Sequence, residues 1–338
     1  MDPLVIVLLI LMVVLSFGIG ANDETMATLV GSRVIKTKYV IGLAAILVFI
    51  GVVFLSENVG RTIGENLLGE SVEYNVYMLF AVIISTTIWL VIASITGAPI
   101  STTHSVVGAV FGVAFVWSFQ KDGTFLSSMN WGKLGQVALG WVLSPILGMI
   151  GAITFRFLIE KILSKLQKGL ERTEKIERIF GFLLIGIIGW TQISRGGNDS
   201  ANALGIMYGL IESGQFSAEH SIYLVLAVGI VLASGLVIIG KNVIKNVGNN
   251  LIAIKPSDAV SIELSTSIVI FLATILGFPI SGSHVLIFSV VGAGIAKGER
   301  PERKTFIRIV LSWIITFPIA AILSGIIYGI FLGAIPSL

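Results

Sequence analysis

Two polar motifs occur twice in this chain, each time inside strongly apolar sequence. Gly-x-Asn-Asp is found at residues 20–23 and 196–199, an offset of 176 positions. Gly-x-Pro-Ile-Ser-x-x-His is found at residues 97–104 and 277–284, an offset of 180 positions. Near-equal offsets indicate a duplicated chain. Helix breakers and polar side chains kept in both copies of apolar sequence predict a site where two repeats meet within a membrane.

The composition supports a membrane protein. The 338 residues are 55% hydrophobic and 12% charged, whereas a soluble domain carries about 25% charged residues. Apolar runs near the roughly 20 residues needed to cross a bilayer recur along the chain. Cysteine is absent, which excludes disulfides and thiolate metal sites. We interpret the formal charge of +3 as basic residues that orient the protein in the membrane, and we expect no nucleic-acid partner.

These features predict an all-α polytopic membrane protein built from two inverted-topology repeats. The repeats are residues 1–162 and 179–338, joined by a charged cytoplasmic helix at 163–178. Each repeat contains broken helices and one re-entrant hairpin, giving about eight full or broken spans, two hairpins and about 12 helical segments. Outside the linker, the predicted segments are 3–21, 23–34, 39–56, 74–96, 101–119, 133–162, 179–195, 198–211, 220–240, 258–277, 281–296 and 305–334.

The lysines and arginines predict the topology. With both termini outside and each hairpin re-entrant, the inside loops hold 16 Lys or Arg, and the outside loops hold Arg61, Lys121 and Lys133. This bias follows the positive-inside rule. The first repeat then starts outside and the second inside, so the two hairpins enter from opposite faces. We expect a multi-pass protein of the plasma or inner membrane.

The hairpin tips have the features of an anion site. Gly-Ala-Pro at 97–99 and Gly-Phe-Pro at 277–279 break helices, and the following serines are good N-caps. A helix N-terminus offers free N–H groups and partial positive charge, which favour phosphate-like anions. Two such ends predict an anion cradle that needs no lysine or arginine; the alternative is ordinary capping of two kinked helices. The predicted contacts are Ser101, Thr102, Thr103, Ser281, Gly282 and Ser283.

Asp23 and Asp199 are candidate cation ligands. A carboxylate within a membrane span is costly unless it is paired or bound to an ion. Two bare carboxylates would also repel an anion, so we expect bound cations, with sodium or a proton on each aspartate as alternatives. The other interpretation is that the two aspartates cap the half-helices 23–34 and 199–211. We expect each helix to break at its Asn-Asp motif, so that exposed carbonyls join the carboxylates. Asn22 and Asn198 are candidate anion donors, sodium ligands or caps.

Several other polar residues are secondary candidates. His104 and His284 match between the copies, and we expect each to brace a hairpin tip through a hydrogen bond. Glu263 is an ion-pathway residue or a paired structural carboxylate, and its counterpart is Ile83. Gln192 and Arg195 precede the second Asn-Asp, opposite Ser16 and Ile19. For Arg195 we favour a structural pair with Asp199 over contact with an anion.

The four motif instances, inverted around a central linker, resemble the inorganic phosphate transporter (PiT) family over almost the whole chain. The resemblance implies uptake of inorganic phosphate driven by sodium in some members and protons in others, with the duplicated motifs forming the sites. It also makes a homodimer an expectation. Asn202 completes the family pattern Asn-Asp-x-Ala-Asn in the second copy. The first copy departs from it, because Met26 stands at the matching position and Glu24 adds a carboxylate.

We therefore expect a secondary active transporter that imports inorganic phosphate with sodium, or with protons, by alternating access. The expected partners are phosphate, sodium and membrane lipid. A sulfate or other oxyanion transporter on the same fold is the closest alternative, and an anion channel is a more distant one. The sequence lacks a phosphate loop, His-Glu-x-x-His and Gly-x-Ser-x-Gly, which argues against an enzyme.

Overall fold

The fold is helical throughout the part of the chain that the structure describes. The computed structural model describes residues 2–72, 74–96, 100–119, 124–166, 169–250, 255–299 and 303–335. Extended pairing within these residues is limited to an isolated bridge between Leu68 and Met129. The predicted all-α class is confirmed. The α-helices are α1 (Pro3–Ala21), α2 (Ala27–Gly31), α3 (Thr37–Leu55), α4 (Glu57–Gly64), α5 (Val76–Thr96), α6 (Thr102–Trp117), α7 (Phe125–Ser128), α8 (Trp131–Leu166), α9 (Leu170–Glu212), α10 (Ser221–Gly235), α11 (Lys241–Asn250), α12 (Pro256–Ile275), α13 (Gly282–Ala296) and α14 (Arg303–Ala334).

Seven helices among the described residues are long and apolar enough to cross a membrane. They are α1, α3, α8, α9, α12, most of α14, and a continuous segment from Ala218 to Lys245 that includes α10. This last segment contains a π-helical stretch, Leu236–Gly240, between α10 and α11. Shorter apolar helices lie within α5 and span α6 and α13. The chain is a multi-pass membrane protein.

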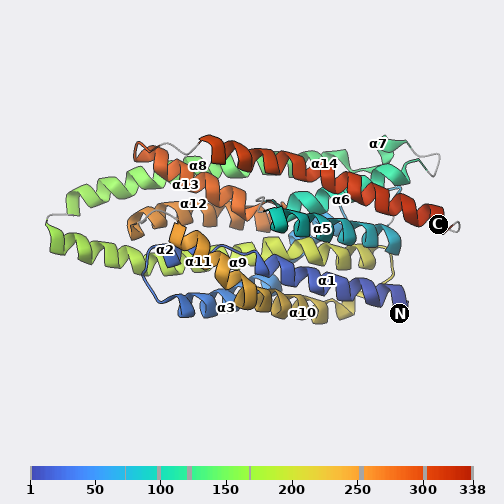
Figure 1. The fold of residues 1–338 in the computed structure, drawn as a ribbon, viewed down its shortest axis with the longest axis horizontal. Helices are drawn as coiled ribbons and strands as arrows, with labels where there is room; N and C mark the ends of the chain where they lie inside the picture. Colours follow the sequence, from blue (N-terminus) through green and yellow to red (C-terminus); the bar gives the residue numbers. More distant parts are fainter. Residues whose placement is uncertain are drawn as a thin grey trace.

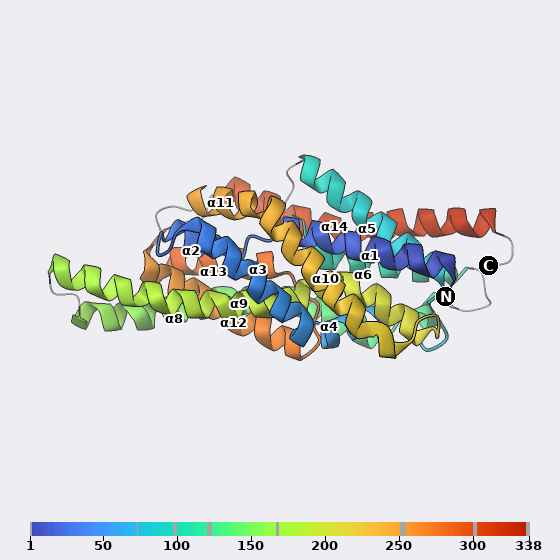
Figure 2. The ribbon, with the colours of Figure 1, turned by 90° about the horizontal axis from the view of Figure 1, so that it is seen from below.

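The arrangement of the helices agrees with two opposed hairpins. Both termini lie at one end of the bundle, and the junction of α8 and α9 lies at the other (Figure 1). The hairpin α5–α6 occupies the half nearer the termini, and α12–α13 occupies the other half (Figures 1 and 2). The second hairpin turns at Gly277, whose φ of +72° is in the left-handed region that favours glycine. The predicted break at 97–99 lies outside the described residues.

Helices from the two halves of the chain pack against each other. α8 packs along α12 and α13, and α14 packs in the corresponding way along α5 and α6. α1 packs on α10, and α3 packs on α9. Each of these contacts joins a helix from the first half of the chain to a helix from the second half, so the two halves interlock. The contacts also come in matching pairs, which is the pattern that two related copies require.

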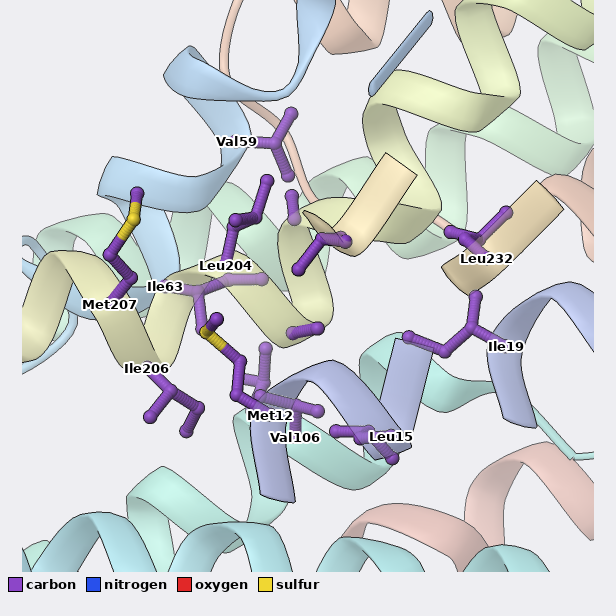
Figure 3. Close-up of a cluster of buried hydrophobic side chains, with 14 of the residues drawn as sticks. Met12, Leu15, Ile19, Val59, Ile63, Val106, Leu204, Ile206, Met207 and Leu232 are labelled. Carbon is purple, nitrogen blue, oxygen red and sulfur yellow. The ribbon is translucent and has the colours of Figure 1, made fainter. Parts of the chain in front are cut away.

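Apolar side chains fill the space where α1, α4, α6, α9 and α10 meet. Figure 3 shows this cluster from within the bundle. Its labelled members are Met12, Leu15, Ile19, Val59, Ile63, Val106, Leu204, Ile206, Met207 and Leu232, all of which are buried. α1 ends at the first Asn-Asp motif, and α9 contains the second. The packing of these helices therefore fixes where the two motifs lie.

The predicted helix break at Gly196-Gly197 is wrong, because α9 runs without interruption from Leu170 to Glu212. The two glycines lie against α3 instead. A Cβ on Gly196 would lie 2.7 Å from the Val48 carbonyl oxygen, and one on Gly197 would lie 2.5 Å from Leu55 Cβ. Small residues of this kind allow membrane helices to approach closely. The glycine pair therefore marks a helix contact, which a local sequence pattern does not distinguish from a break.

Three further predictions are corrected. The described residues of the charged segment 163–178 belong to the two neighbouring helices instead of a linking helix, because α8 continues to Leu166 and α9 already begins at Leu170. The half-helix predicted at 23–34 is the single short helix α2. The span predicted at 220–240 continues through the π-helical stretch into α11, as far as Asn250. A transmembrane helix can continue beyond the bilayer with polar residues. A change from apolar to polar composition therefore does not mark where the helix ends.

The α3–α9 contact predicts how α9 tolerates an added methyl group. Gly197→Ala should lower stability by about 1–3 kcal/mol, because the added carbon overpacks the contact with Leu55. Gly186→Ala is the matched control on the same helix, since a Cβ there meets nothing within 4 Å. Thermal unfolding of the two variants in detergent measures the difference. Equal melting temperatures would contradict the packing role of Gly197.

Candidate functional site

The starts of α6 and α13 meet in one pocket. Its lining includes every residue predicted to contact an anion at the hairpin tips, together with residues of α1, α9 and the adjoining loop. The lining residues are Ile19, Asn22, Ile100, Ser101, Thr102, Thr103, Arg195, Asp199, Ser281, Gly282 and Ser283. The two tips also touch directly, because Thr103 Oγ1 donates a hydrogen bond of 3.2 Å to the Ile280 carbonyl oxygen. The predicted convergence of the hairpins is thus present.

Side chains from three helices satisfy the carbonyls of the second hairpin turn. Asn58 and Thr62 of α4 donate to the carbonyls of Ile275 and Gly277 at 2.8 and 2.7 Å. Trp141 of α8 donates to the Pro279 carbonyl at 2.8 Å, and Asn198 of α9 donates to the Phe278 carbonyl at 3.0 Å. Non-helical backbone within a membrane needs such partners.

Asn198 braces the second hairpin rather than lining the pocket. Besides its bond to Phe278, its amide donates to Thr274 Oγ1 at 3.2 Å, and its Oδ1 accepts from the Ile280 N–H at 3.2 Å. The side chain is buried. Its counterpart Asn22 is exposed and lines the pocket. The two asparagines, which the sequence places in equivalent positions, therefore stand in different surroundings.

The two cap serines also differ. Ser101 Oγ accepts from the His104 N–H at 3.3 Å and lies 2.8 Å from His104 Nδ1, as predicted for a cap and a bracing histidine. Ser281 occupies the N-cap position of α13 as predicted, but its side chain makes no cap hydrogen bond among the described residues. His284 stacks on Trp313 with ring centroids 3.4 Å apart, and its Nε2 has no hydrogen-bond partner among the described residues. The histidine rings lie 5.0 Å apart, which brings the two helix starts together.

Two buried carboxylates, Asp23 and Glu263, form no salt bridge among the described residues. Asp23 accepts hydrogen bonds from the Thr25 hydroxyl at 2.5 Å and from Gln192 Nε2 at 2.6 Å. Glu263, which is fully buried, accepts from Thr28 at 2.7 Å and from Thr191 at 3.2 Å. A buried carboxylate held by neutral donors alone is costly.

Asp199, by contrast, is paired. Arg195 Nε lies 2.9 Å from Asp199 Oδ2, and Arg195 Nη2 lies 2.9 Å from Glu24 Oε1 and 3.0 Å from Ser283 Oγ. The predicted pair of Arg195 with Asp199 is present. The prediction of a cradle without lysine or arginine is wrong, because Arg195 lines the pocket. The i,i+4 spacing of Arg195 and Asp199 is the signal that identifies this pair once α9 is treated as continuous.

Asn202 connects α9 to the first hairpin. Its amide donates to Thr103 Oγ1 at 3.3 Å and to the Asp199 carbonyl oxygen at 3.0 Å. Both tips are therefore attached to α9, the first through Asn202 and the second through Asn198. The pocket lies between these two attachments.

Comparison with known proteins places this geometry in a family. Residues 19–324 match the model of the phosphate transporter family. The chain belongs to that family. A relative from Arabidopsis thaliana, "Inorganic phosphate transporter 2-1, chloroplastic", is 27% identical, with 94% of this chain and 70% of the relative covered. A protein of Pyrococcus abyssi named "Putative phosphate permease" is 28% identical, with 98% of each chain covered.

A solved structure supports the same assignment. The structure described as "The sodium-dependent phosphate transporter" aligns with a TM-score of 0.83 and 25% identity, covering 99% of this chain and 100% of that one. The PiT resemblance drawn from the motifs is confirmed. Membership of a transporter family is consistent with a protein that is not an enzyme.

The difference between the cap serines predicts different effects on stability. Ser101→Ala should cost about 1 kcal/mol of stability, because the start of α6 loses its side-chain cap. Ser281→Ala should leave stability nearly unchanged, because no cap bond is present to lose. Thermal unfolding in detergent compares the two matched variants. A larger loss for Ser281→Ala would contradict the assignment of the caps.

Proposed function

We propose that the protein imports inorganic phosphate together with sodium by alternating access. The charge of the site is the main observation in support. Four carboxylates surround one guanidinium, that of Arg195; they belong to Asp23, Glu24, Asp199 and Glu263. When all five groups are ionised, their net charge is −3 (four negative charges and one positive charge). This net negative charge would repel a phosphate dianion. Bound cations remove the repulsion, so anion and cation binding depend on each other.

The anion is proposed to bind at the hairpin tips. The starts of α6 and α13 both border the pocket, and the first N–H groups of a helix have no partner within it. Hydroxyls of Ser101, Thr102 and Ser283 add further donors around the same space. Helix N-termini of this kind bind phosphate groups. The names of the relatives, phosphate permease and inorganic phosphate transporter, point to the same substrate.

Sodium is proposed to bind at the two buried carboxylates that form no salt bridge among the described residues. Asp23 and Glu263 have nearby hydroxyl oxygens from Thr25, Thr28 and Thr191. The Gln192 Oε1 atom is buried beside Asp23 and accepts no hydrogen bond among the described residues, so it is available as an oxygen ligand. Oxygen donors suit hard cations. Asp199 and Asn22, which border the pocket, would place a further cation beside the anion.

Sulfate transport on the same fold is the second candidate. Phosphate keeps a proton near neutral pH and can donate a hydrogen bond, whereas sulfate cannot. The Asp199 carboxylate borders the pocket and is an acceptor for such a donor. This acceptor favours phosphate over sulfate.

The aspartate assignments predict the loss of coupled uptake. Asp23→Asn and Asp199→Asn should each abolish phosphate uptake driven by a sodium gradient. Asp23→Asn removes a charge that a coupling cation would balance, and Asp199→Asn removes both a proposed cation ligand and the carboxylate that is paired with Arg195. Uptake is measured in proteoliposomes with sodium and pH gradients imposed separately. Glu57→Gln is the control, since Glu57 is an exposed carboxylate paired with Arg61. Sodium-dependent uptake at the wild-type rate would remove the altered aspartate from the cation site.

The substrate is tested by competition. Excess unlabelled phosphate should inhibit uptake of labelled phosphate strongly, and excess sulfate should inhibit it weakly, in wild-type proteoliposomes. Labelled sulfate uptake that excess phosphate leaves unchanged would reject phosphate as the substrate and support the second candidate.

A further inference from the structure

We infer that the Glu24 carboxylate occupies the place of the oxyanion on Arg195, and that the transported anion binds by displacing it. This inference rests on the proposed function, since it concerns the same pocket. It assigns two residues that the duplicated motifs do not contain. Arg195 becomes a direct ligand of the anion, and Glu24 becomes a built-in competitor for the same donors.

Arg195 is placed to bind an anion. The residue is 6% exposed, yet it lines the pocket with Ser101 and Ser283. Its Nε and Nη2 atoms bond Asp199, Glu24 and Ser283, whereas Nη1 has no hydrogen-bond partner among the described residues. A guanidinium presents paired donors that match the oxygens of phosphate or sulfate. The chain therefore brings a fixed positive charge to the helix starts.

The backbone at the start of α13 leaves room for this side chain. A Cβ added to Gly282 would lie 2.7 Å from Arg195 Nε and 2.9 Å from Arg195 Cδ. Any larger residue would push the guanidinium away from the helix start. The absence of a side chain at Gly282 therefore lets the Arg195 guanidinium lie next to the N–H groups that favour an anion.

Glu24 uses the donors that an oxyanion needs. Its Oε1 atom lies 2.9 Å from Arg195 Nη2 and accepts a hydrogen bond of 2.5 Å from Ser283 Oγ. A carboxylate and a phosphate present similar paired oxygens to such donors. Glu24 lies between α1 and α2, outside either helix, so its displacement breaks no helical hydrogen bond. Asp199 is within α9 and stays on Arg195 Nε, where it positions the guanidinium.

The experiment is a double-mutant cycle on phosphate uptake in proteoliposomes. Glu24→Gln should lower the KM for phosphate about tenfold, because the competing charge is gone while the Arg195 donors remain; this equals about 1.4 kcal/mol. Arg195→Gln should raise the KM at least about tenfold by the same conversion. Adding Glu24→Gln to Arg195→Gln should then change the KM little. Glu24→Asp, a shorter carboxylate, should give an intermediate KM.

The outcomes separate the inference from the proposed function. A purely structural Glu24–Arg195 pair predicts that Glu24→Gln leaves the KM unchanged or raises it while melting temperature falls, and either result overturns the inference. Glu57→Gln controls for loss of a surface carboxylate. If Glu24→Gln does not fold, Glu24→Asp decides, since an unchanged KM there overturns the inference too. Wild-type protein that takes up sulfate but no phosphate would reject the proposed substrate, and the cycle is then run with sulfate.

Discussion

A helix broken inside a membrane must have its freed carbonyl groups hydrogen-bonded by protein, and the architecture of this chain depends on that requirement. Donors from α4, α8 and α9 supply those bonds around Gly277. They come from both halves of the sequence. The tip of the second hairpin is therefore held by helices that are far apart in the chain, and the pocket exists because those helices assemble around it. Interlocking of the halves through α8 and α14 has the same effect on a larger scale.

Much of the site could be predicted because its signals are local and occur twice. Pro279 and Gly277 indicate a break wherever they stand in apolar sequence, and the Ser-x-x-His pattern places a helix start directly after it. The duplication then indicates that both starts share one location. The hairpin-tip residues proposed from sequence indeed line one pocket. The all-helical class followed from composition, since only helices with satisfied backbones span a bilayer in chains of this kind.

The remaining features depend on packing between distant segments. Gly196 and Gly197 have the composition of a break, but α3 passes close enough that only glycine fits. Assuming a break there also hid the i,i+4 relation between Arg195 and Asp199, and with it the charge at the pocket. The contact between Arg195 and Glu24 joins positions 171 residues apart (195 − 24 = 171) and leaves no local pattern. The different surroundings of Asn22 and Asn198 likewise arise from tertiary contacts alone.

The Arg195–Glu24 pair joins the two copies and has no symmetry equivalent, because Ile19 of the first copy and Ser200 of the second occupy the matching positions. An inverted repeat with identical copies would have inward-open and outward-open forms of equal free energy, related by its symmetry axis. A charged pair without a symmetry equivalent makes the free energies of these two forms unequal. Under the proposed alternating access, this asymmetry would make the resting population favour one orientation even without a gradient.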